Sequence, residues 1–209
     1  MSAPGLTTPL RTETFENLQL NAGIFLINCD YSGIDNAGAL KTAIQAAVSG
    51  SSGALGTIVG ATRGGGSFTV TRELRQPEVD GRRYGFKGDT FVDSVEAQLS
   101  TTLVEVTPEN LKMLFGSATI TGSAPKQTIK LNTAIDTADY LTNIVWVGDI
   151  ADGRYVLICL NNALNQADIS LTFTDKGEGT LPVEFHAKQA NVDDYDTAPF
   201  EIVYLSPAT

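Results

Sequence analysis

The sequence has very little of the chemistry on which most catalytic and metal sites depend. Its 209 residues include one histidine, His186, and two cysteines, Cys29 and Cys159. No C-x-x-C pair occurs, so zinc or redox sites built from closely spaced thiolates are not expected. The apolar alternation in VEFHAKQ predicts that His186 points outward from a strand as a solvated side chain, not as a catalytic base. We therefore expect no enzyme, no bound metal and no cofactor.

Long apolar runs are also missing. The start of the chain, MSAPGLTTPLRTETF, has no apolar core typical of a secretory signal. No stretch is long and apolar enough to cross a bilayer. The two cysteines lie in the apolar contexts FLINCD and VLICLN, which favours buried free thiols and leaves a disulfide open. These features indicate assembly in a cytoplasm, with no membrane partner.

Positive charge is scarce in the second part of the chain. Residues 1–90 carry eight Lys and Arg and eight Asp and Glu, whereas residues 91–209 carry six and sixteen, for a formal net charge of -10. A surface of this kind repels phosphate groups. Tight binding to nucleic acid and docking on anionic membranes are therefore disfavoured.

Two motifs come close to known ligand sites without matching them. GATRGGGSF, residues 60–68, has the glycine and serine spacing of a phosphate-binding P-loop, but Gly66 stands in place of the lysine. The SFTVT segment within it alternates as a strand does, where a P-loop requires a helix. NVDDYDT, residues 191–197, lacks the glycine and glutamate of a calcium-binding EF-hand loop. We interpret the first as backbone freedom before a strand and the second as a solvated acidic turn.

The periodicities present are mostly those of strands. We expect a mainly β fold, a β-sandwich or barrel-like sheet with one or two flanking helices, in a single domain over residues 1–209 with an extended N-terminal arm over about 1–16. Helices are predicted at Asp35–Ser49, with Asp35 as N-cap, and after Thr107 in PENLKMLFG. The run YVLICL is apolar on both faces and predicts a central strand. Strands are predicted at Leu18–Asn28, Ser67–Thr71, Phe91–Val106, Gln127–Leu131, Asn143–Gly148, Arg154–Asn161, Ile169–Thr174, Leu181–Lys188 and Phe200–Leu205.

The segment RELRQPEVDGRRYGFKGD, Arg72–Asp89, is a long inter-strand loop over about residues 72–90. Loops of this length are usually functional or disordered, and a β-arm with a turn at Asp80-Gly81 is equally consistent with the residues. Its five basic and four acidic residues suit a complementary contact between subunits. The candidate contact residues are Arg72, Arg75, Glu78, Asp80, Arg82, Arg83, Lys87 and Asp89.

Four segments together resemble the major tail tube protein of long, non-contractile-tailed bacteriophages or of a related prophage. They are LQLNAGIFL, GATRGGGSFTVTRELRQPEVDGRRYGFKGD, VEAQLSTTLVEVTPENLKMLFG and LPVEFHAKQANVDDYDTAPFEIVYL. The similarity in order and spacing runs from about Leu18 to Leu205. It implies a structural virion protein whose hexameric rings stack into a tube for passage of the genome, assembled in the host bacterial cytoplasm. It also implies tape measure, tail terminator and baseplate proteins as partners.

In such a tube the inner sheets of neighbouring subunits join around a lumen. Under this resemblance, Gly64, Gly65 and Gly66 permit close approach to a neighbouring backbone and a bend into an inner strand. DNA must slide through without specific binding, which an acidic, hydroxyl-rich lining favours. The candidate lumen-facing residues are Thr69, Thr71, Glu96, Gln98 and Ser100.

Two other functions remain open at this point. A carbohydrate- or partner-binding β-sandwich requires aromatic side chains exposed on one strand face, and Trp146 in NIVWVGD is the candidate. An enzyme that uses carboxylates as acid and base, such as Glu96 and Glu105 or the Asp193–Asp196 cluster, requires a cleft, which the sequence does not reveal.

Overall fold

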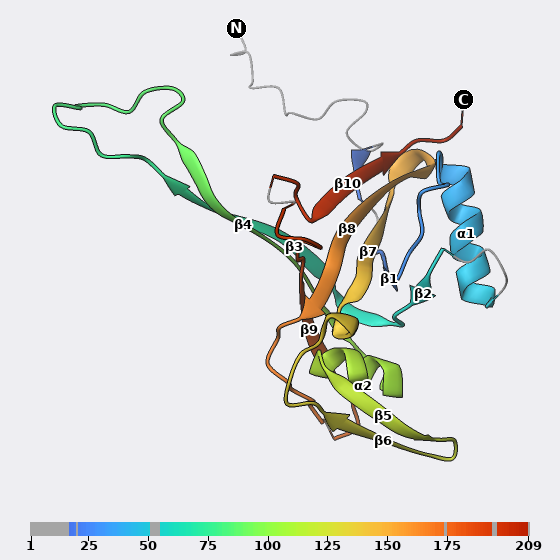
Figure 1. Cartoon of the computed structure of the whole chain (residues 1–209). Helices are drawn as coiled ribbons and strands as arrows, with labels where there is room; N and C mark the ends of the chain where they lie inside the picture. Colours follow the sequence, from blue (N-terminus) through green and yellow to red (C-terminus); the bar gives the residue numbers. More distant parts are fainter. Residues whose placement is uncertain (1–16, 20, 51–54, 174, 194–195, 209) are drawn as a thin grey trace, which may run out of the picture.

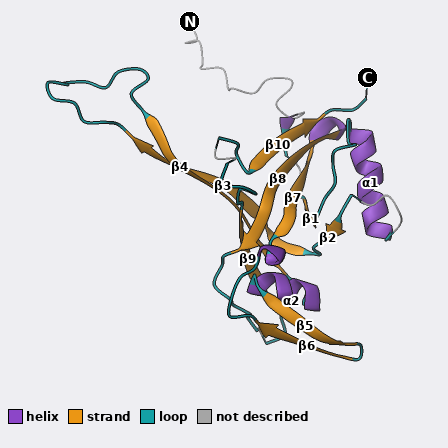
Figure 2. Ribbon diagram, in the orientation of Figure 1, coloured by secondary structure: helices purple, strands orange, loops and turns teal. Residues whose placement is uncertain are grey.

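The computed structural model describes residues 17–19, 21–50, 55–173, 175–193 and 196–208. The fold is mainly β and sandwich-like, as the sequence predicted, with two α-helices (Figure 1, Figure 2). The N-terminal arm predicted over residues 1–16 lies outside the described residues. The helices are α1 (Ala37–Ser49) and α2 (Pro108–Phe115). The strands are β1 (Ile24–Ile27), β2 (Thr57–Ile58), β3 (Thr62–Arg75), β4 (Phe91–Leu103), β5 (Ala118–Ser123), β6 (Lys126–Leu131), β7 (Leu141–Ile150), β8 (Arg154–Asn165), β9 (Leu181–His186) and β10 (Phe200–Leu205).

Eight strands form one antiparallel sheet in the order β2-β1-β7-β8-β9-β4-β3, with β10 also paired to β8. Strand β8 is the branch point, because its first half, from Tyr155 to Leu160, pairs with β10, whereas Leu164 and Asn165 pair with β9. The sheet therefore folds over on itself, so that β3, β4 and β9 face β1, β7 and the first half of β8 (Figure 1). The central position predicted for YVLICL is confirmed.

The two halves of the sheet and α1 form three layers, with one apolar core between each pair of neighbouring layers. The core between the two halves of the sheet holds large buried side chains from both, such as Phe25 and Trp146 from one half and Leu99 and Phe185 from the other. The opposite face of β1, β7 and β8 is covered by α1, whose Leu40 is completely buried. This arrangement follows from β7 and β8, in which successive apolar residues point alternately toward one core and the other.

Each helix begins after a residue whose side chain accepts a hydrogen bond from an unpaired backbone N–H of the first turn, and each ends at a glycine. The side chain of Asn36 accepts a hydrogen bond from the Ala39 amide at the start of α1, so the predicted cap at Asp35 is wrong by one residue. Gly50 ends α1 in the left-handed conformation. The Thr107 cap, Pro108 in the first turn and the Gly116 stop are all confirmed for α2.

Several predicted strand boundaries are corrected. The strand predicted at Leu18–Asn28 is only β1, with an isolated bridge from Gln19 to Ile150. Residues 169–173 form no strand beyond a bridge from Thr172 to Thr180. Strand β5 was missed, although it pairs with β6 in a separate hairpin beside α2.

Cys29 and Cys159 are buried and free, as the favoured prediction held. Burial raises the pKa of the Cys29 thiol to about 12, and burial also raises the pKa of Cys159. The Tyr31 hydroxyl donates to the Cys159 Sγ at 3.2 Å. Both thiols therefore stay protonated near neutral pH and serve as apolar packing in the core under α1.

Candidate assembly interface

The most prominent feature is an arm formed by β3 and β4, which projects far from the sandwich (Figure 1). At its root, Phe68, Ala97 and Leu99 pack in the core between the two halves of the sheet. Strand β3 continues to Arg75, so the segment predicted as a loop begins inside a strand, and residues 76–90 form the arm tip. Both predictions for this segment hold in part, because Arg72–Arg75 extend β3 while residues 76–90 form a long loop without strand pairing, which includes a turn at Asp80-Gly81.

The arm exposes large apolar side chains that the sequence analysis did not select. The exposed fraction is 82% for Tyr84, 69% for Phe86 and 65% for Val79 at the tip. Leu74, Val92 and Val95 lie on the same strand face as the buried Leu99, yet about half of each remains exposed. A group of this size on one projecting element is typical of a surface that another protein covers. In the sequence, this exposed apolar surface could have been predicted from Tyr84 and Phe86, two aromatic residues within a charged loop.

The eight charged residues predicted to contact other subunits divide into two groups. Arg82 forms an ion pair with Asp89 and donates to the backbone oxygens of Pro77 and Tyr84 at 2.7 and 3.1 Å. The Phe86 amide, which donates to Asp89 at 2.7 Å, is the main cause that lowers the pKa of that carboxyl. Arg75 pairs with Asp93 across the two strands. These three residues thus organise the arm itself, whereas Arg72, Glu78, Asp80, Arg83 and Lys87 are exposed.

Gly64, Gly65 and Gly66 lie inside β3, not before it as predicted. Gly64 and Gly65 have φ angles of 77° and 74°, within an irregularity where the pairing with β4 shifts between Thr62 and Gly66. The left-handed conformation explains glycine at both positions. No atom lies within 4 Å of a Cβ placed on Gly64, so another backbone has room to approach there. A Cβ on Gly66 instead would lie 2.6 Å from the Ser100 oxygen and 2.8 Å from Phe25.

Replacing Gly66 with alanine should destabilise the fold. The added methyl group has to displace the β4 backbone and a core aromatic ring, and overpacking of this kind costs about 1–3 kcal/mol. We expect a melting temperature several degrees lower in a thermal melt. Gly33→Ala is the matched control, because no atom lies within 4 Å of its added Cβ. Equal melts for the two variants would contradict the packing role of Gly66.

The five residues predicted to face the lumen share one face of the arm root. Thr69 pairs with Gln98 and Thr71 with Glu96, while the Ser100 hydroxyl lies 2.8 Å from that of Ser67. This polar face is opposite to the face that carries the buried Ala97 and Leu99. Strand β9 extends it, since Glu184 and His186 lie opposite Ser100 and Gln98. Their common placement is thus confirmed, while the identity of what they face stays a prediction.

His186 lies on this polar face, as predicted, but it is not solvated. Only 11% of its side chain is exposed, and its Nε2 lies 2.9 Å from a Glu184 carboxylate oxygen. The expectation of a freely solvated histidine is therefore wrong. Alternation along a strand determines which face a residue occupies, but the neighbours on that face determine its exposure.

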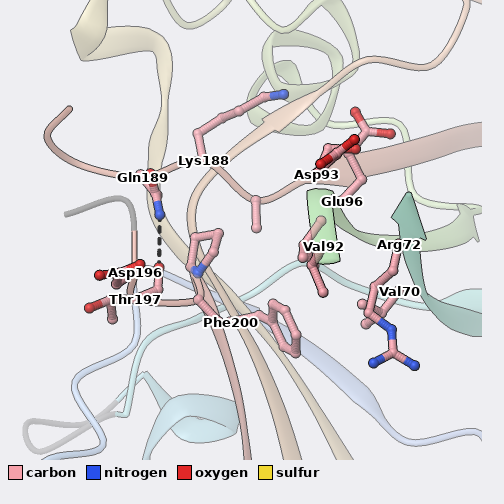
Figure 3. Close-up of a pocket in the computed structure, with 15 residues that line it drawn as sticks. Val70, Arg72, Val92, Asp93, Glu96, Lys188, Gln189, Asp196, Thr197 and Phe200 are labelled. Atoms are coloured by element: carbon pink, nitrogen blue, oxygen red, sulfur yellow. Dashed lines mark hydrogen bonds between the residues drawn. The ribbon is translucent and has the colours of Figure 1, made fainter. Parts of the chain in front are cut away.

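A groove lies where the arm leaves the sandwich. It has a volume of about 880 Å³ and runs between the arm and residues 187–189 and 196–200. Figure 3 shows Val70, Val92 and Phe200 around one space, with charged side chains at its margin. The Phe200 ring also contacts the Phe68 ring, with centroids 5.7 Å apart, where the two halves of the sheet meet. We call this feature the arm-root groove.

No family model matches the sequence, and no curated protein is significantly similar to it. Within the described residues, no group of three His, Cys, Asp or Glu side chains could hold a metal ion. In the same part of the chain, no helix is long and apolar enough to cross a membrane. Trp146 is 9% exposed and donates from its ring nitrogen to the Ala22 oxygen at 2.9 Å, so it is a core residue and not a stacking platform for sugars.

We expect no ligand-dependent stabilisation by nucleotides or divalent ions. The lysine of a P-loop is replaced by Gly66, and the glycines lie in a strand where a phosphate cradle requires a loop before a helix. Thermal melts with ATP–magnesium, calcium or zinc should superpose on the melt without additives. A reproducible rise beyond about 3 °C would show binding to the native state and contradict this expectation.

Proposed function

We propose that this chain is a structural subunit of a phage tail tube, which polymerises as stacked hexameric rings into the conduit for the genome. The observation that carries the proposal is the arm, a projecting hairpin with exposed Tyr84, Phe86 and Val92. A protein that acts as a monomer gains nothing from this much exposed apolar surface on a thin projection. The surface has a clear use if each subunit contacts its neighbours through the arm.

The open edge of β3 supports the same function. This 14-residue strand is the last in the sheet order, and among the described residues it pairs on one side only, with β4. A long exposed edge is a hazard in a monomer because it can pair with other chains. In a ring of subunits the edge is closed by the next sheet, and the open space beside Gly64 admits the neighbouring backbone.

The polar face of β3, β4 and β9 suits a lumen through which DNA moves. Its carboxylates at Glu96 and Glu184 repel phosphate, and its hydroxyl and amide groups offer no fixed positive charge to hold DNA. In this proposal the protein is not an enzyme and belongs to the virion tail, after assembly in the bacterial cytoplasm. Its other partners are the tape measure, tail terminator and baseplate proteins.

Negative-stain electron microscopy of the purified protein tests the proposal, together with light scattering after size exclusion. Rings or hollow tubes of uniform diameter are expected, and particle averages should show six-fold symmetry. Monodisperse monomers over a wide range of concentration and salt would overturn the function. A sharp symmetry other than six-fold would retain the tube and correct the ring number.

A further inference from the structure

We propose that the arm tip of one copy docks into the arm-root groove of a second copy. This inference rests on the proposed self-assembly and names the surface that receives the arm. The docked side chains are Val79, Tyr84 and Phe86, and the receiving wall consists of Val70, Val92, Val95 and Phe200.

The receiving wall belongs to the core-facing side of the sheet, at a place where the opposite half of the sheet does not cover it. Val92 and Val95 occupy the same face of the arm as the buried Leu99, yet they are 53% and 45% exposed. The opposite half of the sheet does not reach them, because the arm diverges from β10 beyond the contact between Phe68 and Phe200 (Figure 1). Apolar side chains in a core pattern that stay exposed in the subunit indicate burial in an assembly.

The arm tip has the complementary shape and chemistry. Arg82 bonds to the backbone oxygens of Pro77 and Tyr84 and pairs with Asp89, which holds the tip in one conformation. The side chains of Tyr84 and Phe86 remain exposed to solvent. Aromatic anchors held in place before binding lose little conformational entropy on docking. The tip lies at the far end of the arm from the groove of its own copy, so it can reach only the groove of another molecule (Figure 1).

Charge favours the same pairing. Residues 62–90 carry six Lys and Arg and four Asp and Glu, whereas the rest of the chain carries eight and twenty. The arm is thus the basic part of an acidic protein. The groove carries charge of both signs, with Arg72 and Lys188 beside Asp93, Glu96 and Asp196 (Figure 3). Asp93 is already paired with Arg75 of its own copy, so Asp196 and Glu96 are the carboxylates that the exposed Arg83 and Lys87 of an incoming tip can approach. Complementary charges around an apolar centre fix orientation and speed association.

A contact between a tip and a groove uses two different surfaces of the same chain. Such a head-to-tail contact leaves one tip and one groove unused in every pair, so each added copy presents a new site. It therefore supports growth of a ring or a filament, where a symmetric contact would stop at a dimer.

The test uses one variant for each half of the contact. Phe86→Asp blocks the tip and Val95→Asp blocks the groove, and both positions are exposed enough to accept aspartate without unfolding. Each variant alone should fail to grow beyond small species. A 1:1 mixture should form a dimer that does not grow, because only the intact tip of the Val95 variant and the intact groove of the Phe86 variant can pair. Val48→Asp on α1, at a position 71% exposed, is the matched control and should assemble normally.

A photo-crosslinker at position 86 of the otherwise unchanged chain separates this inference from the proposed function. Cross-links between copies that map to Val92, Val95 or residues 196–200 support the docking site, whether the assemblies are tubes or other oligomers. Tubes with cross-links elsewhere, or a mixture that behaves as each variant alone, would overturn the docking site and leave the tail tube proposal standing. A wild-type protein that does not self-associate would overturn both.

Discussion

Replacing residues 76–90 with an Asn-Gly turn should leave the subunit folded and abolish polymerisation. Arg75 and Phe91 are paired across the hairpin, and a two-residue turn of this type closes two antiparallel strands at such a pair. The deletion removes Val79, Tyr84 and Phe86 together, none of which packs in either core. Circular dichroism and the thermal melt should stay close to those of the parent chain, while tubes and rings disappear from negative-stain images.

A variant with the same 15 positions replaced by glycine and serine separates the loss of side chains from the loss of length. It should fail to assemble as well, because the side chains and not the reach of the arm supply the contact energy. Normal tubes from either variant would show that residues 76–90 make no essential contact between subunits. Assembly of the parent chain should also weaken as salt rises, since the charged residues around the tip are exposed.

If the chain forms a tail tube lined by the polar face, lysines on that face should make the tube bind and retain DNA. Glu96→Lys with Gln98→Lys makes each subunit more positive by three charges, on strand positions whose side chains lie opposite Thr71 and Thr69. If this face lines the lumen, tubes should assemble and then bind DNA. The affinity should fall steeply with salt, because each neutralised phosphate releases counterions. Particles that carry the variant should eject their genome poorly.

Asp35→Lys with Gln45→Lys gives the same change in net charge around α1, on the opposite side of the sandwich from the polar face. It should leave DNA retention in the tube unchanged. DNA binding of both double variants is measured in parallel by filter retention across a salt series. The comparison separates the effect of where the lysines lie from the effect of the added charge. Equal behaviour of the two variants, or normal ejection with lysine at 96 and 98, would remove the polar face from the lumen.

Local patterns in the sequence were sufficient for most of the elements. The bounds of α2 are set by local residues. Thr107 caps the first turn with its side chain, Pro108 suits the first helical position, and Gly116 ends the helix. Strand β10 is observed at Phe200–Leu205, as predicted. The alternation along β3 and β4 also placed Thr69, Thr71, Glu96, Gln98 and Ser100 on one face, because successive side chains on a strand point to opposite sides.

Features that depend on distant parts of the chain were beyond such patterns. The branching of β8 between β9 and β10 results from the register between segments far apart in sequence. The segment at residues 169–173 also resembles a strand, but apart from the bridge between Thr172 and Thr180 it joins no sheet. Gly66 is required by the Phe25 ring and the Ser100 backbone, two groups that only folding brings beside it.

The sequence by itself determined a mainly β chain, poor in histidine and cysteine, with its polar and apolar faces in the correct phase. Only the tertiary structure decided which apolar positions are buried. Val95 and Leu99 have the same phase on β4, yet 45% of Val95 is exposed and 2% of Leu99. The phase of a side chain is a local property of its strand, whereas its burial depends on how far the opposing half of the sheet extends, and here that half ends before the arm does.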